Sequence, residues 1–463
     1  MKGVFKQYQE KEAETTVKSR FSFSNTQIIA LGFLSIIFFG AIMLTLPAAA
    51  RSGESTPFIN SLFTATSATC ITGLAVYDTW SHWTPFGQAV ILALIQIGGL
   101  GFMTIISLFS VFMKRKISLH ERRLLMQSVG TMRIGGIIRL IKRIALGTLL
   151  FEGIGAALLA IRFCPEMGLA RGLWYSVFHS VSAFCNAGFD LMGYRKPFSS
   201  LTAFRGDVLV NLTITGLIIV GGLGFLVWND LITQISRRHH LQLHTKVVLS
   251  ATGLLLVFSF AAFFFLEYDH SIAGLSLGER LLASWFQAVT PRTAGFNTVE
   301  LTRLSHGSDL TTIFLMFVGG SPGSTAGGIK TTTLAVMLLC TAASAHNRNG
   351  CTLFKRRLTD DLMQQASAIV TIYMISVILS TILLTALEPI TLTEALFEVT
   401  SAAGTVGLTK GITPLLGNAS KILLMVLMFG GRVGGLTLAL VLWEGKPHVN
   451  APLQRPKERI MIG

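Results

Sequence analysis

The chain has 463 residues, of which 51% are hydrophobic and only 13% are charged, and its formal net charge is +15. Soluble globular proteins carry about 25% charged residues, so this composition excludes an ordinary water-soluble domain and is typical of a chain that faces lipid. The five cysteines include no Cys-x-x-Cys pair, which argues against a disulfide framework and against a zinc site.

Eight apolar runs follow one another along the chain, and each is long enough to cross a bilayer, which takes about 20 residues. In chain order they are 26–48, 85–113, 136–163, 208–231, 247–266, 311–341, 363–387 and 422–443. The run 311–341 is interrupted by glycines. Because the N-terminus is polar and the first run is long, we expect no cleavable signal peptide.

Lys and Arg gather in the segments that follow the second, fourth and sixth apolar runs, for example at Lys114, Arg238 and Lys355. Short basic loops stay in the cytoplasm. We therefore expect a multi-pass plasma membrane protein whose basic loops and two termini are cytoplasmic. Topology explains most of the positive charge, so no nucleic acid is needed as a partner, and membrane lipid is the expected surrounding.

Four segments repeat one pattern, in which an aromatic residue precedes a glycine by ten positions. The segments are 63–74, 178–189, 285–296 and 397–408, and their glycines are Gly73, Gly188, Gly295 and Gly407. They lie between runs 1 and 2, 3 and 4, 5 and 6, and 7 and 8, so all four open on the same side of the membrane, opposite to the basic loops. Four such units in one chain can close a ring around an axis, which is how a pore is made.

A short half-apolar stretch precedes each of these glycines, at 57–68, 173–184, 279–289 and 393–402. Each stretch is too short to cross a membrane, and the backbone that follows it must be buried in protein or line a wet cavity. We therefore expect four short pore helices whose following loops aim carbonyl groups at one axis.

The three residues before each glycine complete four candidate filter segments. They are Cys70, Ile71, Thr72 and Gly73; Cys185, Asn186, Ala187 and Gly188; Arg292, Thr293, Ala294 and Gly295; and Gly404, Thr405, Val406 and Gly407. None of them contains Asp or Glu, which argues against a calcium-type carboxylate ring. Backbone carbonyls around a glycine favour K⁺, and the Thr405–Gly407 tripeptide matches the start of the TVGYG filter of potassium channels.

Glycine-rich stretches also occur in the second apolar run of each repeat. For those at 98–101 and 221–224, close helix packing is the first interpretation. The third repeat differs, because Gly319, Gly320, Ser321, Pro322, Gly323, Ser324, Thr325, Ala326, Gly327 and Gly328 break the run in mid-membrane. A flexible plug below the filter fits such a break. A phosphate loop does not, since Ile329 intrudes before Lys330 and no strand precedes it.

Arg432 is a charge in the middle of the last apolar run. Such a charge costs about 2.5–3.5 kcal/mol on insertion scales and normally faces the interior or a water path. Two interpretations stay open. Arg432 either lines the pore, where it repels a cation or holds the 319–328 loop closed, or it ties helix ends or loop carbonyls together. Lys330 has a similar role or snorkels to the surface.

Other titratable groups in the apolar segments include Glu152, His179 and Glu398. The last two lie nine positions before their filter glycines, where they either tune the pore entrance or brace the pore helix. No catalytic triad, pair of catalytic carboxylates or metal cluster is present in the sequence, so we expect a protein that is not an enzyme and has no transition-metal site.

The filter segments, the four span–pore–span repeats and the break in the third repeat together resemble the Trk/Ktr/HKT superfamily of potassium transporters, and the eight runs are most similar to a Ktr-type membrane subunit. The resemblance implies K⁺ uptake, with K⁺ held at the filter carbonyls and gated at 319–328 and Arg432. It implies Na⁺ as an activator, no covalent cofactor, a homodimer, and a cytosolic nucleotide-binding ring (a KtrA-like RCK subunit) that binds the nucleotide. Asn186, Arg292 and Gly404 depart from a uniform ring, so a less clean selection is expected.

The predicted fold class is an all-α polytopic membrane protein with eight transmembrane helices and four re-entrant pore loops, pseudo-fourfold around one pore. The expected segments are an N-terminal segment 1–25, pore repeats 26–113, 136–235, 247–342 and 362–445, basic loops 114–135, 236–246 and 343–361, and a C-terminal tail 446–463. Two alternatives stay open. One is a secondary transporter, coupled to sodium or protons, with a site at the midplane. The other is a non-transporting membrane scaffold.

Overall fold

The computed structural model of the protein describes residues 25–113, 121, 125–126, 136–237, 240–346, 351–354 and 356–434. Within these residues the chain is helical apart from turns, loops and one antiparallel hairpin of β1 (Thr352–Leu353) and β2 (Arg356–Arg357). The C-terminal tail 446–463, nearly all of the N-terminal segment 1–25 and most of the basic loop 114–135 lie outside the described residues.

The helices fall into four sets with a similar internal order. The first set is α2 (Asn25–Thr45), α3 (Phe58–Cys70), α4 (Thr79–His82), α5 (Pro85–Leu100) and α6 (Phe102–Phe112). The second is α8 (Ile137–Met167), α9 (Leu169–Phe184), α10 (Val208–Leu223) and α11 (Phe225–Arg237). The third is α12 (Leu243–Leu266), α13 (Leu277–Val289), α14 (His306–Phe317) and α15 (Thr331–Ala345), and the fourth is α16 (Asp360–Leu387), α17 (Leu392–Gly404) and α18 (Asn418–Val433).

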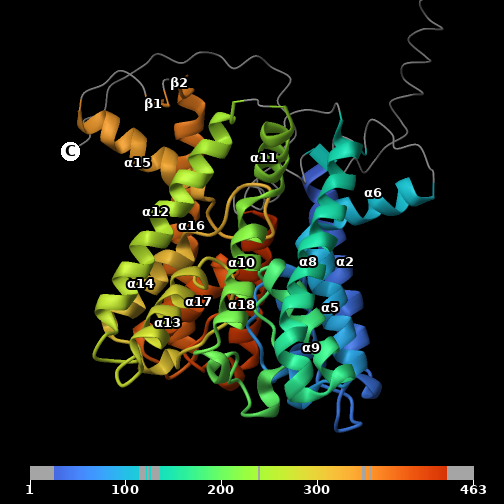
Figure 1. Ribbon diagram of the computed structural model, residues 1–463. Coiled ribbons are helices and arrows are strands. Elements are labelled where there is room, and N and C mark those ends of the chain that lie inside the picture. Colours follow the sequence, from blue (N-terminus) through green and yellow to red (C-terminus); the bar gives the residue numbers. More distant parts are fainter. Residues whose placement is uncertain are drawn as a thin grey trace, which may run out of the picture.

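Three helices recur in every set, and we name them by their order. The first helices are α2, α8, α12 and α16; the short helices are α3, α9, α13 and α17; the return helices are α5, α10, α14 and α18. Brief 3-10 turns lie in the connections, at Pro47–Ala49, Met192–Tyr194, Thr202–Phe204, Leu301–Arg303 and Thr413–Leu415. The short helices gather in the lower half of Figure 1.

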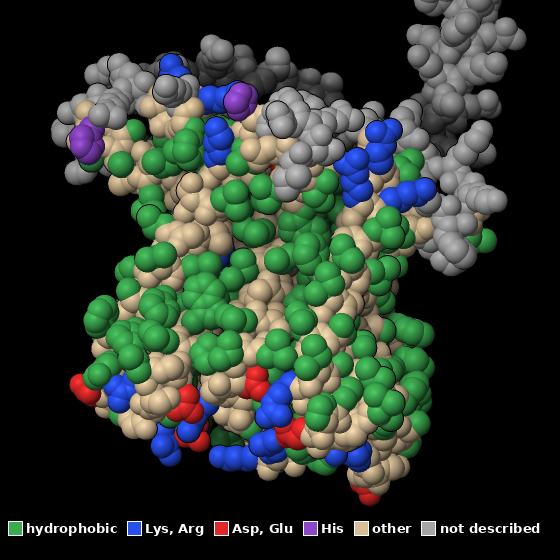
Figure 2. Space-filling model, in the orientation of Figure 1, with side chains coloured by type: hydrophobic (Ala, Val, Ile, Leu, Met, Phe, Trp, Pro, Cys, Tyr) green, Lys and Arg blue, Asp and Glu red, His purple; other side chains and the backbone are tan. Residues whose placement is uncertain are grey.

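The first helices are long and apolar, and most of their surface faces outward. Only 28–33% of the most apolar 18-residue window of each is buried inside the protein. Leu146, Leu254 and Phe265 are 68%, 72% and 76% exposed, and Figure 2 shows a belt of hydrophobic side chains between two ends that carry charge. Water would disfavour such a belt, whereas lipid matches it. The protein is therefore a multi-pass membrane protein.

Two of the apolar runs that the sequence predicts as spans are not continuous helices. The run 85–113 divides at Gly101 into α5 and α6, and the run 208–231 divides at Gly224 into α10 and α11, whose axes differ by 92°. Both glycines have a positive φ (80° and 96°), a conformation that ends an α-helix. In the described part of the chain only the four first helices pass a length and hydropathy test for spanning, with α10 and α11 as a bent fifth.

Local capping signals explain where several helices begin. Ser276 with Glu279 and Thr391 with Glu394 form capping boxes at the starts of α13 and α17. Asp207 caps α10 and Ser305 caps α14 through side-chain acceptors. These caps fix the first residues of two short helices and two return helices.

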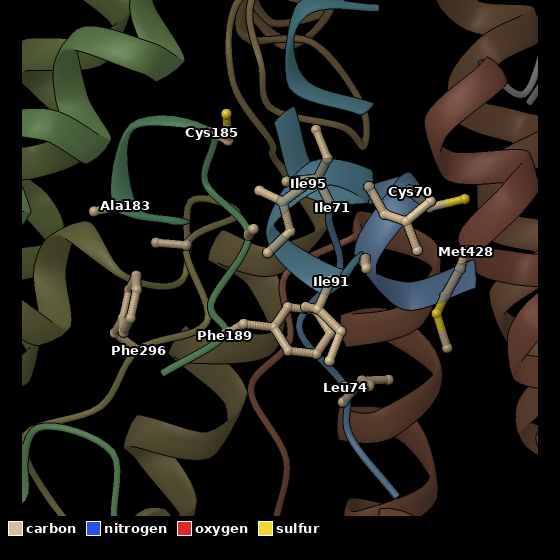
Figure 3. Close-up of a cluster of buried hydrophobic side chains, with 14 of the residues drawn as sticks. Cys70, Ile71, Leu74, Ile91, Ile95, Ala183, Cys185, Phe189, Phe296 and Met428 are labelled. Carbon is tan, nitrogen blue, oxygen red and sulfur yellow. The ribbon is translucent and has the colours of Figure 1, made fainter. Parts of the chain in front are cut away.

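The four sets close into a circle. Each first helix packs on the short helix of its own set, and each return helix also packs on the short helix of the next set. The second kind of contact joins α5 to α9, α10 to α13, α14 to α17 and α18 to α3, so the last set contacts the first. Figure 3 shows the result at the centre, where Cys70, Cys185, Phe296 and Met428 from all four sets share one buried cluster.

Candidate cation filter and gate

The four candidate filter segments follow the four short helices and share one backbone conformation. Two residues before each glycine, φ is positive at Ile71 (59°), Asn186 (60°), Thr293 (67°) and Thr405 (53°). The glycines themselves have φ of 93°, 71°, 82° and 91°. The residue between them is not in the left-handed region, so the sign of φ alternates. Alternation turns successive carbonyls to the same side of the chain, the arrangement that carbonyl filters use.

The glycines meet one another in a closed ring that follows chain order. A Cβ on Gly73 would lie 2.6 Å from the carbonyl oxygen of Ala187, one on Gly188 would lie 2.8 Å from that of Ala294, and one on Gly295 would lie 2.7 Å from that of Val406. A Cβ on Gly407 would meet the carbonyl oxygen of Thr72, which closes the circle. Each glycine therefore packs backbone to backbone against the next repeat, and no side chain fits there.

Hydroxyl groups at the ends of the short helices brace these segments. The backbone N–H groups of Gly73 and Gly407 each donate to a serine Oγ at 3.0 Å, on Ser67 and Ser401. In the second repeat, Ser182 Oγ donates to Phe189 O at 2.7 Å. In the third repeat, Thr290 Oγ1 makes the matching bond to Phe296 O. The braces satisfy backbone groups that the irregular loop would otherwise leave buried and unpaired.

The side-chain departures that the sequence shows do not disturb this backbone. Arg292 is only 7% exposed and turns away to α12, where a guanidinium N–H donates to Thr252 Oγ1 at 3.4 Å. Asn186 is fully buried, and Gly404 leaves room for Met316 O and Val406. The unlike residues therefore change the packing behind the ring, while the four glycines keep equivalent positions.

A cavity of about 410 Å³ lies beside the ring of glycines, and we call it the vestibule. All four filter glycines line it, together with Asp78, Asp190, Lys196 and Glu300. Asp190 lies two residues after Gly188 and accepts a bond from Met192 N at 2.9 Å. Removal of its carboxyl from water, with a smaller contribution from the nearby Asp78, raises the pKa of Asp190 to about 7.

On the other side of the ring, the 319–328 segment is a loop between α14 and α15. It is closed at its base, where Gly319 N donates to Ile329 O at 2.9 Å and Thr331 N donates to Gly320 O at 3.0 Å. It is also bonded to the second repeat, because Ser321 N donates to Gly222 O at 3.0 Å. The sequence prediction of a broken helix here agrees with the end of α14 at Phe317 and the start of α15 at Thr331.

Arg432 connects three repeats on the side of the ring where the 319–328 loop lies. It is on α18 of the fourth repeat, and its guanidinium donates to Thr325 O in the 319–328 loop and to Gly98 O at the end of α5. Lys330 also turns toward the loop, where its Nζ donates to Ala326 O at 2.7 Å. Arg432 therefore ties the end of α5 to a carbonyl of the loop, and a role of Arg432 in lining the pore stays a prediction.

The glycines of the return helices make room for the ends of the short helices. A Cβ on Gly98, Gly221 or Gly431 would meet the carbonyl oxygen that lies four residues before the filter glycine of the same repeat, on Thr69, Phe184 and Ala403. Close packing thus explains these glycines, as the sequence predicted for the first two repeats. The partner, however, is the backbone behind the filter instead of a second spanning helix.

The remaining predicted polar groups lie behind the ring. His179 pairs with Tyr175 O at 2.7 Å and accepts from Leu191 N at 3.2 Å, and Glu398 accepts from Thr413 Oγ1. Glu152 accepts from Gln96 at 3.2 Å. In the described residues no three His, Cys, Asp or Glu side chains come together as a metal site.

A family model for TrkH, described as a cation transport protein, matches residues 5–447 of the chain. This chain belongs to the TrkH family of cation transport proteins. The predicted resemblance to Trk and Ktr proteins is confirmed.

Several relatives of this TrkH-family chain match along nearly its whole length. The potassium/sodium uptake protein NtpJ of Enterococcus hirae is 41% identical, over 95% of this chain and 97% of that protein. The Ktr system potassium uptake protein B of Bacillus subtilis is 42% identical, over 90% and 92%. The crystal structure of the potassium transporter TrkH from Vibrio parahaemolyticus has a TM-score of 0.74 at 18% identity, covering 92% of this chain and 86% of that one, so it shares the fold.

Sequence reasoning missed a set of buried polar residues at the starts of the return helices of this TrkH-family chain. Gln88, Asp309 and Lys421 are 2%, 4% and 7% exposed, and Lys410 in the fourth filter loop pairs with Asp309. A polar residue just before or near the start of an apolar run is a visible signal. Its partner is not visible, because it lies in another repeat.

Proposed function

We propose that this chain is the pore-forming subunit of a potassium uptake system and that K⁺ passes through the ring formed by the four filter segments. The closed order of contacts from Gly73 to Gly188, Gly295 and Gly407 carries the proposal. A ring of backbone carbonyls replaces the water around K⁺ without a fixed negative charge. The names of the relatives, which are potassium and potassium/sodium uptake proteins, favour the same cargo.

The driving force for this uptake is the membrane potential. A potential of 100 mV is worth about 2.3 kcal/mol for each charge that crosses, so K⁺ accumulates without a nucleotide bound at the pore. In this proposal the vestibule faces the outside and the basic loops face the cytoplasm, as the distribution of Lys and Arg predicts.

Gating is assigned to the 319–328 loop and Arg432. The loop is bonded to the second repeat through Gly222 O, and Arg432 bonds it to the fourth and first repeats. Its glycines let the backbone move once these few bonds break. We infer that the loop closes the path on the cytoplasmic side of the filter, and that the fixed positive charge of Arg432 there repels the cation in the filter.

A cytosolic ring that binds a nucleotide is the partner that this proposal expects to control the gate, and a second copy of the chain is expected beside it. The names of two relatives as parts of a Ktr system favour a multi-component assembly. Na⁺ is expected to stimulate uptake. Co-purification of the chain with a Ktr-type regulatory subunit, followed by mass measurement, tests both contacts.

The decisive experiment is Rb⁺ uptake into a bacterial strain that lacks its own potassium uptake systems, with increasing Na⁺ as competitor. The wild-type chain is expected to restore uptake and to prefer Rb⁺ over Na⁺. Gly407→Ser is expected to lose that preference, because its Cβ would meet Thr72 O. Unchanged uptake and preference in Gly407→Ser would contradict the filter, and absence of any wild-type flux would favour a scaffold.

A further inference from the structure

The four seams between successive repeats share a feature near the vestibule. In each return helix, the fourth residue after the N-cap is buried and polar. These residues are Gln88, Asn211, Asp309 and Lys421, with exposures of 2%, 1%, 4% and 7%. A buried polar side chain in an apolar helix requires a hydrogen-bond partner, so the position of each partner is informative.

The partner comes from the next repeat at three of the four seams. Gln88 Oε1 accepts from Trp174 Nε1 on α9 at 2.9 Å. Lys421 Nζ donates to Asn60 Oδ1 on α3 at 2.9 Å, which closes the circle from the fourth repeat to the first. Both of these bonds join a return helix to the short helix that carries the next filter segment.

The seam between the second and third repeats uses the next turn of its helix. Asn211 donates to Phe204 O at 2.8 Å within its own repeat. Thr215, one turn further along α10, accepts from Trp285 Nε1 on α13 at 3.1 Å. Every seam therefore contains a side-chain bond between neighbouring repeats near the start of its return helix, and we call these four contacts the seam bonds.

The seam bond between the third and fourth repeats is an ion pair. Lys410 Nζ lies 2.7 Å from Asp309 Oδ1, and the two side chains are only 9% and 5% exposed. Lys410 follows the filter glycine Gly407 by three residues, and its Nζ also donates to Leu301 O at 2.9 Å. All other ion pairs in the described part of the chain include a side chain that is at least 43% exposed.

We propose that the Asp309–Lys410 pair is a positioning element that holds the fourth filter segment against the third repeat, and that the seam bonds together set the width of the ring. The inference rests on the proposed filter. A ring of carbonyls prefers K⁺ only while its oxygens keep their spacing, since a looser ring follows the ion and admits Na⁺. Removal of one partner also leaves a buried charge unpaired, which displaces the loop that carries it.

The test compares Asp309→Asn, Lys410→Met and the exchanged pair Asp309→Lys with Lys410→Asp. Each is expressed in the uptake-deficient strain, and the concentration of Na⁺ that halves Rb⁺ uptake is measured. We expect the preference for Rb⁺ over Na⁺ to fall by about tenfold in each single variant, which corresponds to about 1.4 kcal/mol. The exchanged pair is expected to recover part of it, a rescue that a loss of folding alone would not produce.

Arg303→Met is the matched control for Lys410→Met, because Arg303 pairs with Glu300 at 2.8 Å but is 77% exposed. It is expected to leave the preference unchanged. Membrane abundance is measured for every variant. If Lys410→Met fails to reach the membrane, Trp174→Phe tests the first seam instead, since it removes the N–H that donates to Gln88 and keeps an aromatic ring.

Two outcomes separate this inference from the filter itself. If Gly407→Ser loses the preference while Asp309→Asn and Trp174→Phe keep it at normal abundance, the seam bonds do not position the ring and only this inference fails. If Gly407→Ser also keeps the preference, the filter proposal fails as well.

Discussion

The two sides of the ring are built differently. On the filter side, four segments with unlike side chains have the same backbone, with φ of 53–67° two residues before glycines whose φ is 71–93°. On the other side, the third repeat has the 319–328 loop and the fourth repeat has Arg432. An ion on an axis must be coordinated equally from all sides, whereas a path can be closed from one side. This difference supports our proposal that the four equivalent segments select the ion and that the unequal elements act as the gate.

The largest effect is expected from any filter glycine. Gly73→Ala would place a Cβ 2.6 Å from Ala187 O, and φ of 93° is itself strained for a residue with a side chain. The backbone strain alone is about 1–2 kcal/mol, and we expect Rb⁺ uptake to fall by about 100-fold.

The comparison also requires that Gly188→Ala and Gly295→Ala behave like Gly73→Ala. Gly216→Ala on α10 is the control, since a Cβ there meets nothing within 4 Å. A filter glycine that tolerates alanine would show that the four sides are not equivalent.

The next largest effect is expected from Arg432→Gln, which removes the charge and weakens the bonds to Thr325 O and Gly98 O. We expect Rb⁺ uptake to rise by roughly fivefold, the lower end of what coupled sites show. Arg143→Gln is the control, because Arg143 is an exposed arginine that bonds to Asn229 at 2.7 Å, away from the ring. Lower uptake in Arg432→Gln would mean that the arginine supports the open pore.

A smaller effect concerns charge at the vestibule, where the repeats differ although their backbones agree. The residues two positions after the glycines are Ala75, Asp190, Asn297 and Thr409, so only the second repeat presents a carboxylate. The pKa of Asp190 is raised to about 7. Below that pH the carboxyl is neutral, and above it the charge attracts cations. Uptake is expected to rise about threefold from pH 6 to pH 8.

Asp190→Asn is expected to remove this pH dependence, with uptake at every pH close to the wild-type rate at pH 6. A pH dependence that survives in Asp190→Asn would assign it to another group in the assay. Asp78→Asn is the second carboxylate variant to be measured in the same assay. Asp78 also lines the vestibule, but its carboxylate accepts from Phe198 N at 3.0 Å and from Ser81 N at 2.8 Å.

The smallest effect is expected from the braces. Ser67→Ala and Ser401→Ala each leave a buried glycine N–H without its acceptor, which costs about 1–3 kcal/mol when nothing replaces it. We expect both to lower the Rb⁺ over Na⁺ preference by about threefold and to the same degree, because the two repeats are equivalent here. A clear difference between the two variants would limit the equivalence to the backbone.

Much of the site could be predicted from residue types and spacing. The four glycines, the short helices before them and the break at 319–328 are local features, since each follows from what a glycine or an apolar stretch does to its own backbone. The division of α5 from α6 and of α10 from α11 was not predicted. In the run 85–113 both halves are apolar, and hydropathy reports composition but not the direction of a helix.

What the sequence by itself determined is the set of apolar helices, the four filter segments and the two unusual elements of the third and fourth repeats. Only the tertiary structure decided which groups meet. Arg432 bonds to Gly98, Lys421 to Asn60 and Lys410 to Asp309, and members of these pairs are roughly 100 to 360 residues apart. These contacts between distant residues form only when the four repeats close into a circle, and a local sequence pattern does not show which repeats become neighbours.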